Sequence, residues 1–294
     1  MGRMRVRVYF LCAVWLAAWL LVGVGTLRGE TRNARMQRKR DPLGLYLGRD
    51  SLRVRMAETS RFAPYENNFF MLGMPVDRKP TKENSGVMFQ ISIQQRFFRR
   101  PLFWNSNFYV AYTQRSFWDV FLESSPFDDN NYNPSLHYTL PMMFRGYFAG
   151  MVDLGLEHLS NGRGGADSRS LNSVSLRLKY YPHILFMIDL KAWLPFLYKE
   201  DNPDYFEYAG YGRVGLLFRY PRWGIRSSIY LNPSDKFRNW NVTYELGYSP
   251  WENYTVYFFL RFYSGYAERL LRYKEYTCNA RVGITLAPSF MLFH

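Results

Sequence analysis

The chain has 294 residues, of which 48% are hydrophobic and 19% aromatic, and this composition excludes a disordered protein. Its formal net charge of +14 would suit a nucleic-acid-binding protein, but residues 1–60 hold 12 basic and 4 acidic side chains, which leaves a net +6 for the other 234 residues. The excess charge is local, and no nucleic-acid partner is expected.

The first 27 residues, MGRMRVRVYFLCAVWLAAWLLVGVGTL, contain three arginines followed by an apolar stretch that ends in small residues. This layout predicts a secretory signal peptide over residues 1–27, with cleavage near Gly25. A retained helical anchor is the alternative, because the apolar stretch is about as long as a membrane span. In both cases the rest of the chain is expected to be exported.

Residues 28–63 form a basic extension that includes RGETRNARMQRKRD. We expect this segment to be a solvated linker, because a run of like charges is usually exposed to water. Contact with anionic lipid is the alternative.

The cysteines and histidines predict neither a disulfide nor a transition-metal site. Of the two cysteines, Cys12 lies in the expected signal peptide, so Cys278 has no partner within the mature chain. The four histidines show no zinc-ligand spacing.

Beyond residue 60 no apolar run is long enough for a transmembrane helix, but segments of alternating apolar and polar residues recur throughout. Twelve such segments are expected to be strands, and an even number is typical of bacterial outer-membrane barrels. They lie near residues 67–75, 86–96, 106–117, 134–144, 148–160, 171–181, 184–193, 206–219, 223–231, 239–248, 253–263 and 277–290.

The connections and the side-chain parity favour a barrel in lipid. Short links such as RGY alternate with long polar ones such as WDVFLESSPFDDNNYN, and one parity of the strands is apolar (Phe89, Ile91) while the other is polar (Gln90, Ser92). Residues 64–294 are therefore predicted to form an all-β fold, a 12-stranded antiparallel transmembrane β-barrel, with a soluble β-sandwich as the alternative. Charged residues of the inner parity are expected to form a salt-bridge network: Asp153, Glu157, Arg177, Lys179, Asp189, Lys191, Arg213, Glu245 and Arg261.

One polar stretch interrupts the apolar parity. In VDLGLEHLS the period of two places His158 and Ser160 on the same face as Leu154 and Leu156. If Gly165 is the apex of the following loop, paired residue numbers sum to 330, and His158 lies opposite Asn172. A nucleophile, a base and an orienting amide would then share the outer wall.

These residues carry a family resemblance. The pattern H-x-S-N-G-R, followed by S-R-S-x-N with the asparagine twelve residues after the serine, closely resembles the active-site hairpin of bacterial outer-membrane phospholipase A. Further matches are YTQRSFWD, ESSPFDDNNYNP, DNPD after IDLKAW, and YSGYAE before the last strand. The resemblance extends from about residue 64 to near the end of the chain.

The resemblance implies an outer-membrane phospholipase A1/A2 in which Ser160 is the nucleophile, His158 the general base and Asn172 the group that orients the imidazole. It implies a calcium ion as cofactor, a phospholipid substrate and a homodimer as the active state. An asparagine in place of an aspartate orients the histidine without adding charge, so stabilisation of the oxyanion gains importance.

The resemblance also implies the residues around this triad. Gly162 would donate its backbone N–H to the oxyanion, and the carbonyls of Arg163 and Ser168 would bind calcium, together with Ser124 from a second protomer. Gln114 would form a hydrogen bond across the dimer interface, although it also fits an ordinary polar residue.

Two other interpretations stay open on the residues alone. Ser, Asn and Gly-Gly in a hairpin loop usually serve only the turn, and an interfacial histidine can be an amphipathic anchor. The alternative function is a non-catalytic outer-membrane barrel or pore with a polar interior.

Overall fold

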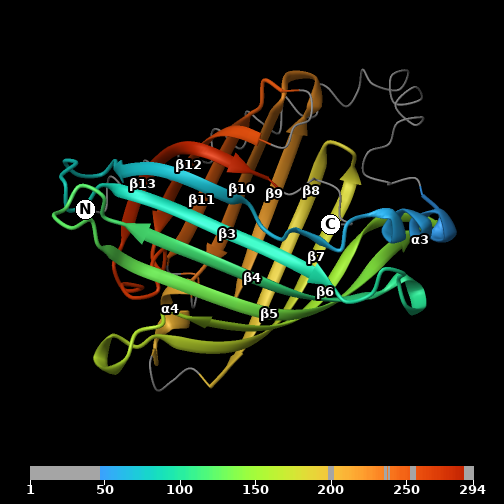
Figure 1. Ribbon diagram of the computed structural model, residues 1–294, viewed down its shortest axis with the longest axis horizontal. Helices are drawn as coiled ribbons and strands as arrows, with labels where there is room; N and C mark the ends of the chain where they lie inside the picture. The colour runs from blue at the N-terminus through green and yellow to red at the C-terminus, as the bar shows by residue number, and fades with distance from the viewer. Residues whose placement is uncertain (1–46, 198–201, 235–236, 238, 252–255, 288–294) are drawn as a thin grey trace. The chain divides into compact units, whose positions relative to one another are not determined.

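A computed structural model describes residues 47–197, 202–234, 237, 239–251 and 256–287 (Figure 1). The expected signal peptide lies outside the described residues, as does the expected extension up to residue 46. None of the helices in the described part of the chain has the length and apolar character that crossing a membrane requires.

The described strands form a closed antiparallel barrel, which confirms the predicted fold class. Each strand pairs with its neighbours in the chain, and pairing of the last strand with β2 closes the barrel; the short strand β1 (Phe62–Pro64) pairs with β3 beyond the end of β2. The twelve barrel strands are β2 (Asn68–Pro75), β3 (Gly86–Arg96), β4 (Asn107–Trp118), β5 (Phe127–Phe144), β6 (Tyr147–Ser160), β7 (Ser170–His183), β8 (Phe186–Phe196), β9 (Gly212–Tyr220), β10 (Ile225–Pro233), β11 (Trp240–Tyr248), β12 (Val256–Gly265) and β13 (Thr277–Leu286).

The structure corrects two of the expected strands. β5 begins at Phe127 and not near residue 134. The sequence did not indicate this earlier start, because the first residues of the strand, FDDNNYN, are mostly polar on both faces and show no apolar alternation. The segment expected as a strand over 206–219 begins instead with the short helix α4 (Tyr205–Ala209). Gly210 ends this helix at φ +76°, where a Cβ would lie 1.9 Å from the carbonyl oxygen of Pro233.

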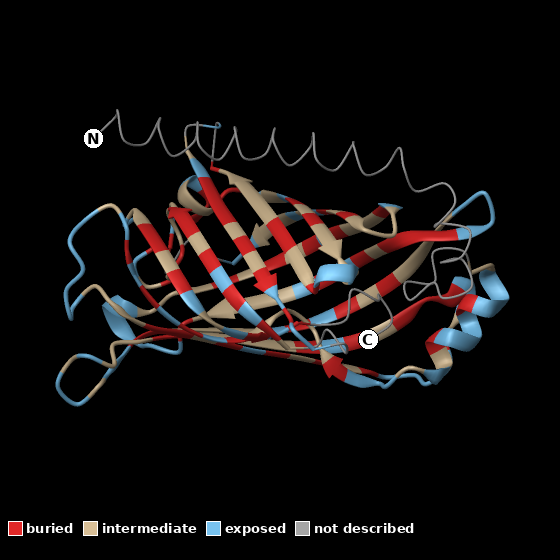
Figure 2. Cartoon of the chain, turned by 90° about the horizontal axis from the view of Figure 1, so that it is seen from above, coloured by how far each residue is buried: buried red, intermediate tan, exposed pale blue. Residues whose placement is uncertain are grey.

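Buried and more exposed residues alternate along the strands of the barrel wall, as the banding in Figure 2 shows. Outward residues such as Leu154, Leu156 and Leu176 are about half exposed to the surroundings of the barrel, at 50%, 52% and 54%. An apolar outer surface with a polar interior fits a lipid environment.

The inner face carries most of the expected salt-bridge network; among the described residues Asp153 contacts His137 instead, and Lys179 is in none of the ion pairs. Arg177 pairs with Asp189 at 2.7 Å and with Glu66 at 2.6 Å, and Arg213 pairs with Asp189 at 3.2 Å. Further pairs are Lys191 with Glu157, Arg261 with Glu245, and Arg281 with Glu268. Buried charges are tolerated when they are paired and hydrogen-bonded, and these pairs tie strands across the interior.

Helix α3 (Arg49–Glu58) lies at the end of the barrel where the short turns gather (Figure 1). Leu52 and Met56, four residues apart on one face, are buried in a cluster with Phe148 and Met151 of β6. The Arg96 guanidinium donates hydrogen bonds to the carbonyls of Met56, Thr59 and Ser60, and so it satisfies the C-terminal end of the helix. This part of the expected linker is folded against the barrel.

A second apolar cluster lies at the end with the long loops. It joins Leu171 of β7 to Tyr205 and Phe206 of α4 and to Leu270 and Tyr273 of the loop before β13. Within the described residues, the lumen is thus packed with apolar side chains near both ends. This arrangement does not favour the interpretation of the chain as a pore.

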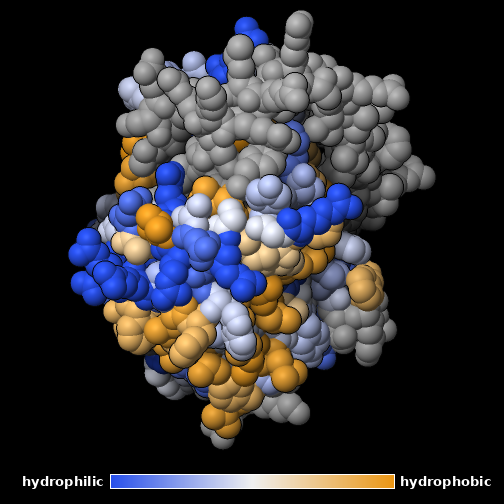
Figure 3. All heavy atoms as spheres, turned by 90° about the vertical axis from the view of Figure 1, so that its right-hand side faces the viewer, coloured by the Kyte–Doolittle hydropathy of each residue, from blue (hydrophilic) through white to orange (hydrophobic). Residues whose placement is uncertain are grey.

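The short-turn end presents arginines beside exposed aromatic residues. Phe103 and Trp104, in the connection between β3 and β4, are 85% and 74% exposed, and Arg99 and Arg100 precede them. Figure 3 views this end, where hydrophilic and hydrophobic atoms lie side by side. Aromatic residues at the rim of a barrel are typical of the boundary between lipid tails and headgroups.

Glu268, in the long loop between β12 and β13, forms an ion pair with Arg281, and the stability that this pair contributes depends on pH. Burial alone would raise the pKa of Glu268, but the paired Arg281 guanidinium outweighs it and lowers the pKa to about 2. Stability from this pair is therefore present above the unfolded-state pKa of about 4.3 and is lost as the pH falls toward 2.

Glu268→Gln is expected to lower the thermal unfolding midpoint at pH 7, because it leaves Arg281 buried without its charge partner, at a cost of about 3–5 kcal/mol. The difference from wild type should shrink as the pH is lowered from 5 to 2. Circular dichroism melts in detergent across this range measure it, and a difference independent of pH would contradict the prediction.

Candidate active site

The hairpin of β6 and β7 has the predicted register. Leu154 pairs with Leu176, Leu156 with Val174, and His158 with Asn172, so paired residue numbers sum to 330. Backbone alternation thereby places the imidazole and the amide on the same outward face as the exposed leucines, at the end of the barrel with the long loops.

The two side chains of the pair are in direct contact. His158 Nδ1 and Asn172 Oδ1 lie 2.9 Å apart. An amide oxygen only accepts, so Nδ1 carries the proton and Nε2 keeps a lone pair, as a general base requires. Ser160 lies two residues along the same strand and is half-buried; no hydrogen bond joins it to His158 in the part of the chain that the structure describes. Such contacts are often long before substrate binds.

The backbone beside His158 is held by a residue that the sequence analysis did not identify. Asn133 of β5 donates from Nδ2 to the carbonyl of His158 at 3.0 Å. It belongs to the segment ESSPFDDNNYNP, which the resemblance contained without a role for this residue. The next residue in strand register, Tyr132, pairs with Ser160.

The loop after Ser160 is organised by a second residue that was missed, Asn161. Its side chain is only 4% exposed. Its Oδ1 accepts from the backbone N–H groups of Arg163 (3.2 Å) and Arg169 (3.0 Å), and its Nδ2 donates to the carbonyl of Asp167 (2.8 Å). One asparagine thus fixes both ends of the loop, a short-range pattern that Asn side chains commonly form in turns.

Gly162 follows directly, and its conformation requires glycine for two reasons. Its φ is +67°, which disfavours other residues. A Cβ at this position would lie 2.9 Å from Cε2 of Tyr132. The backbone N–H at residue 162 is therefore held in an unusual conformation within two residues of Ser160.

The expected calcium ligands lie on two long loops at the same end of the barrel. Arg163 and Ser168 belong to the loop between β6 and β7, and Ser124 belongs to the exposed turn between β4 and β5, with φ 61°. Among the described residues, Ser124 makes no hydrogen bond to Arg163 or Ser168 within the same protomer. No group of three or more His, Cys, Asp or Glu side chains in the described ranges could hold a metal, which leaves carbonyl and hydroxyl oxygens as candidates.

The carbonyls of this loop already attract a cation. The Arg169 guanidinium donates to the carbonyl of Ser168 at 2.6 Å and to that of Ala166 at 3.0 Å. Oxygen ligands of this kind are those that calcium prefers. The carbonyl oxygens of this loop are therefore suitable ligands for a hard cation. The Arg169 guanidinium lies beside them, at a position where positive charge is favourable.

Gln114 makes two hydrogen bonds within its own strand. Its Oε1 accepts from the Tyr112 hydroxyl at 3.0 Å, and its Nε2 donates to Ser116 Oγ at 3.1 Å. Among the described residues these contacts use one N–H and one lone pair of the amide, which leaves a second donor and a second acceptor site for a hydrogen bond across an interface.

Another serine and histidine lie close together in the lumen. His137 Nδ1 is 2.7 Å from Asp153 Oδ1, and His137 Nε2 is 2.9 Å from Ser135 Oγ. The three side chains are buried, and His137 is 1% exposed. This group has the order of a Ser-His-Asp relay, but it faces away from lipid.

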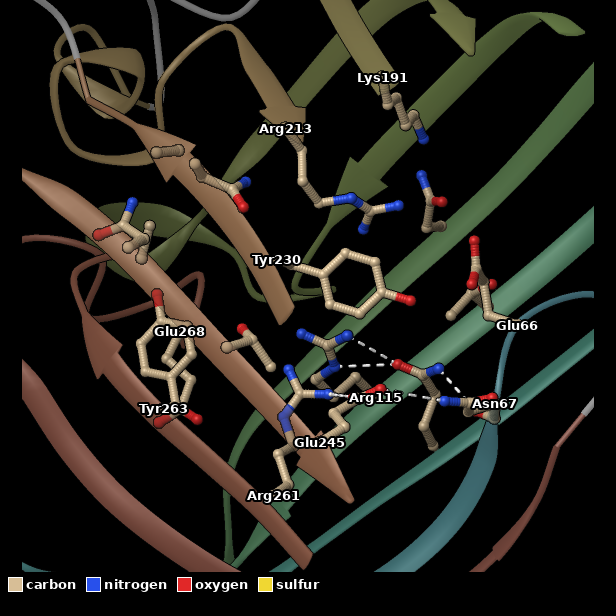
Figure 4. Close-up of a pocket in the computed structure, with 18 of the residues that line it drawn as sticks. Glu66, Asn67, Arg115, Lys191, Arg213, Tyr230, Glu245, Arg261, Tyr263 and Glu268 are labelled. Carbon is tan, nitrogen blue, oxygen red and sulfur yellow. Dashed lines mark hydrogen bonds and ion pairs between the residues drawn. The ribbon is translucent and has the colours of Figure 1, made fainter. Parts of the chain in front are cut away.

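The polar cavity of the lumen is also separate from the hairpin site. It measures about 270 Å³ and is lined by charged and aromatic residues, among them Arg115, Arg213, Tyr230 and Glu245 (Figure 4). The Arg115 guanidinium donates to Gln90 Oε1 at 2.8 and 3.0 Å. None of His158, Ser160 and Asn172 lines this cavity.

Comparison with known proteins points to one family. The family model for phospholipase A1 matches residues 53–286. Phospholipase A1 of Klebsiella pneumoniae is 30% identical over 244 residues, covering 77% of this chain and 82% of the relative. Phospholipase A1 of Escherichia coli (strain K12) is 32% identical over 211 residues, covering 69% of this chain and 70% of the relative.

Solved structures agree with this. Outer membrane phospholipase A from Escherichia coli superimposes with a TM-score of 0.70 at 26% identity, covering 79% of this chain and all of the other. An active-site mutant of that enzyme, with an asparagine replaced by alanine, gives a TM-score of 0.69 at 25% identity, covering 81% of this chain and 98% of the other. The Salmonella typhi outer membrane phospholipase, a dimer with bound calcium, gives a TM-score of 0.69 at 25% identity, covering 82% and 98%.

Proposed function

Because the chain belongs to the phospholipase A1 family and is an outer-membrane β-barrel phospholipase, we propose that it hydrolyses acyl esters of glycerophospholipids with Ser160 as nucleophile. His158 is the general base and Asn172 orients it. The observation that carries the proposal is the 2.9 Å hydrogen bond between His158 and Asn172 on the outward wall, with Ser160 on the same face.

The reaction proceeds in two half-reactions. His158 Nε2 takes the proton of Ser160 Oγ while the oxygen forms a bond to the ester carbonyl carbon. The ester C–O bond then breaks, the lysophospholipid leaves with the proton from His158, and an acyl-serine remains. Water next gives a proton to His158 and attacks the acyl carbon, and the proton returns to Ser160 Oγ as the fatty acid leaves.

The orienting group carries no charge. Asn172 holds the Nδ1–H of His158 and so fixes the tautomer, but it offers the imidazolium no opposite charge. Stabilisation of the negative oxygen in the tetrahedral intermediate therefore matters more than in a triad with an acid. The Gly162 N–H is the donor that we assign to this oxygen, because Gly162 follows Ser160 by two residues in the loop that Asn161 organises.

Calcium is the cofactor that we propose for the same end of the site. The carbonyls of Arg163 and Ser168, with Ser124 of a second protomer, would hold it, and the bound ion supplies positive charge near the developing oxyanion. The hydrogen bond from the cationic Arg169 guanidinium to the Ser168 carbonyl supports this assignment. In the calcium-bound form Arg169 would give up that contact.

A homodimer is the proposed active state. A single protomer presents the triad on an open wall, and among the described residues Ser124 makes no hydrogen bond to Arg163 or Ser168 of its own protomer. Two walls side by side would form a groove for an acyl chain and bring the ligands together, with Gln114 in the interface, where an unsatisfied amide would be costly. A ligand that binds only the dimer stabilises it by mass action.

Calcium dependence tests this proposal. Refolded protein in detergent is expected to lose lipolysis when a chelator removes calcium and to regain it when calcium is restored. Ser124→Ala should raise the calcium concentration needed for half-maximal activity, whereas Ser125→Ala, at the neighbouring position, should leave it unchanged. Undiminished activity in the chelator would contradict the assigned cofactor.

The dimer is tested in nanodiscs that hold either one or two protomers. Two protomers in one disc are expected to show calcium-dependent activity, and a single protomer is expected to lose it. Chemical cross-linking in detergent should increase with calcium and a substrate analogue. Full calcium-dependent activity in single-protomer discs would refute the dimer.

A further inference from the structure

At the end of the barrel with the long loops, β7 continues to pair with β6 after its pairing with β8 has ended. On the side of β6, pairing continues to Ser160 with Ser170. On the side of β8, pairing ends at Asn172 with Phe196. Among the residues that the structure describes, none pairs with Ser170 as a strand on that side, and Ser170 is two residues from the proposed orienting group.

The side chain of Asn202 bonds to the backbone of Ser170 on that side. Its Oδ1 accepts from the backbone N–H of Ser170 at 3.2 Å, and its Nδ2 donates to the carbonyl of Ser170 at 2.9 Å. These two contacts reproduce the donor and acceptor of a strand backbone. Asn202 is 0% exposed, so its amide meets Ser170 without competition from water.

The segment that carries Asn202 is itself anchored. The carbonyl of Asn202 accepts from the N–H of Tyr205 at the start of α4. Tyr205 and Phe206 pack against Leu171, the residue after Ser170. Asp204 forms an ion pair with Lys274 at 2.6 Å. The edge of β7 is thus held by a polar contact and an apolar one from the same segment.

The direction of the Ser170 backbone also indicates how β6 and β7 pair at the triad. Alternate residues of an antiparallel strand direct their backbone groups to opposite neighbours. The backbone of Ser170 points to Asn202, so toward β6 the pairs Ser160 with Ser170 and His158 with Asn172 are of the type without backbone hydrogen bonds. In that type the side chains lie closer together.

We propose that Asn202 is a positioning residue for ester hydrolysis, because its carboxamide fixes the edge of β7 and thereby the distance from Asn172 to His158. This inference rests on the proposed function, in which Ser160 is the nucleophile. Asn202 touches neither substrate nor the reacting atoms, and it acts through Asn172 and through the loop that ends at Ser170.

The test measures the rate at which an alkyl fluorophosphonate labels Ser160 in folded, calcium-loaded protein. Asn202→Ala and the isosteric Asn202→Asp, which keeps the acceptor but loses the donor, should label roughly 10- to 100-fold more slowly than wild type, because a small misplacement of a reacting group costs up to about 100-fold. The aspartate variant preserves side-chain volume and keeps the test valid if the alanine variant does not fold.

Asn241 offers a matched control. It is also a buried asparagine that clamps loop backbone: its Nδ2 donates to the Tyr208 carbonyl and its Oδ1 accepts from the Tyr266 N–H, both at 2.7 Å. It holds the far end of α4 without touching β7. Asn241→Ala should lower thermal stability and leave the labelling rate within about twofold of wild type.

A double-mutant cycle separates positioning from a general loss of stability. If Asn202 acts through Asn172, then Asn202→Ala should slow labelling far less in an Asn172→Ala background than in wild type. Equal effects in both backgrounds, or an equal effect of Asn241→Ala, would overturn the inference. Absence of labelling in wild type would instead contradict the proposed nucleophile, so the two failures are distinguishable.

Discussion

Ser160→Ala is expected to reduce lipolysis by about six orders of magnitude, the loss that follows removal of a triad nucleophile in other serine hydrolases. Without the hydroxyl no acyl-serine forms, and His158 and Asn172 have no oxygen to activate. The residual rate should come only from lipid binding and oxyanion stabilisation. The measurement is release of fatty acid from mixed micelles of phospholipid and detergent with calcium present.

The lumen supplies the control for this prediction. Ser135 also lies within 2.9 Å of a histidine ring nitrogen, but it is buried inside the barrel. The Ser135→Ala variant should therefore keep wild-type lipolysis and wild-type labelling of Ser160 by a fluorophosphonate. Asn172→Ala should lose less than Ser160→Ala, since it orients the base without carrying charge. Wild-type rates in Ser160→Ala would rule out Ser160 as the nucleophile.

Gly162→Ala is expected to lower the turnover number by roughly 10²- to 10³-fold, which is the loss on removing one oxyanion donor. The added methyl group would lie 2.9 Å from the Tyr132 ring, and φ at this position is +67°. Both effects displace the backbone N–H that we assign to the oxyanion. The change should appear in the turnover number more than in the Michaelis constant, because the contact strengthens in the transition state.

Gly164, in the same loop, provides a control, because it tests whether any glycine-to-alanine change in this loop lowers activity. Gly164 has a φ of −109°, and a Cβ there would meet nothing within 4 Å. Gly164→Ala should keep wild-type turnover. The double variant Gly162→Ala/Tyr132→Ala removes the clash and leaves the backbone strain, so it should recover only part of the activity. A fully active Gly162→Ala would exclude this N–H from the mechanism.

The hairpin register was predictable because local signals agreed. Apolar alternation up to Leu156 fixes which residues face outward, and the glycines of the loop mark its apex, so His158 had to lie opposite Asn172. The barrel followed from the same alternation together with the alternating loop lengths. The roles of the site residues came from the family resemblance, since H-x-S alone is a weak signal.

The contacts that the sequence did not reveal join distant parts of the chain. Asn202 meets Ser170 across 32 residues, and nothing in DNPD indicates a backbone partner. The buried face of α3 consists of two residues in a basic segment, too few to show a helical period. The aromatic residues of FEYAGYG suit a strand as well as α4, and only packing against Leu270 and Tyr273 decides between them.

The pairing of β13 with β2 has a consequence for folding. Other neighbouring strands of the barrel are consecutive in sequence and can form as hairpins, but Leu286 pairs with Asn68, more than two hundred residues away. The entropy of closing so long a loop must be overcome before this contact contributes, so closure is expected to be slow and late. Until then the sheet exposes two unpaired edges, and these edges invite aggregation between chains.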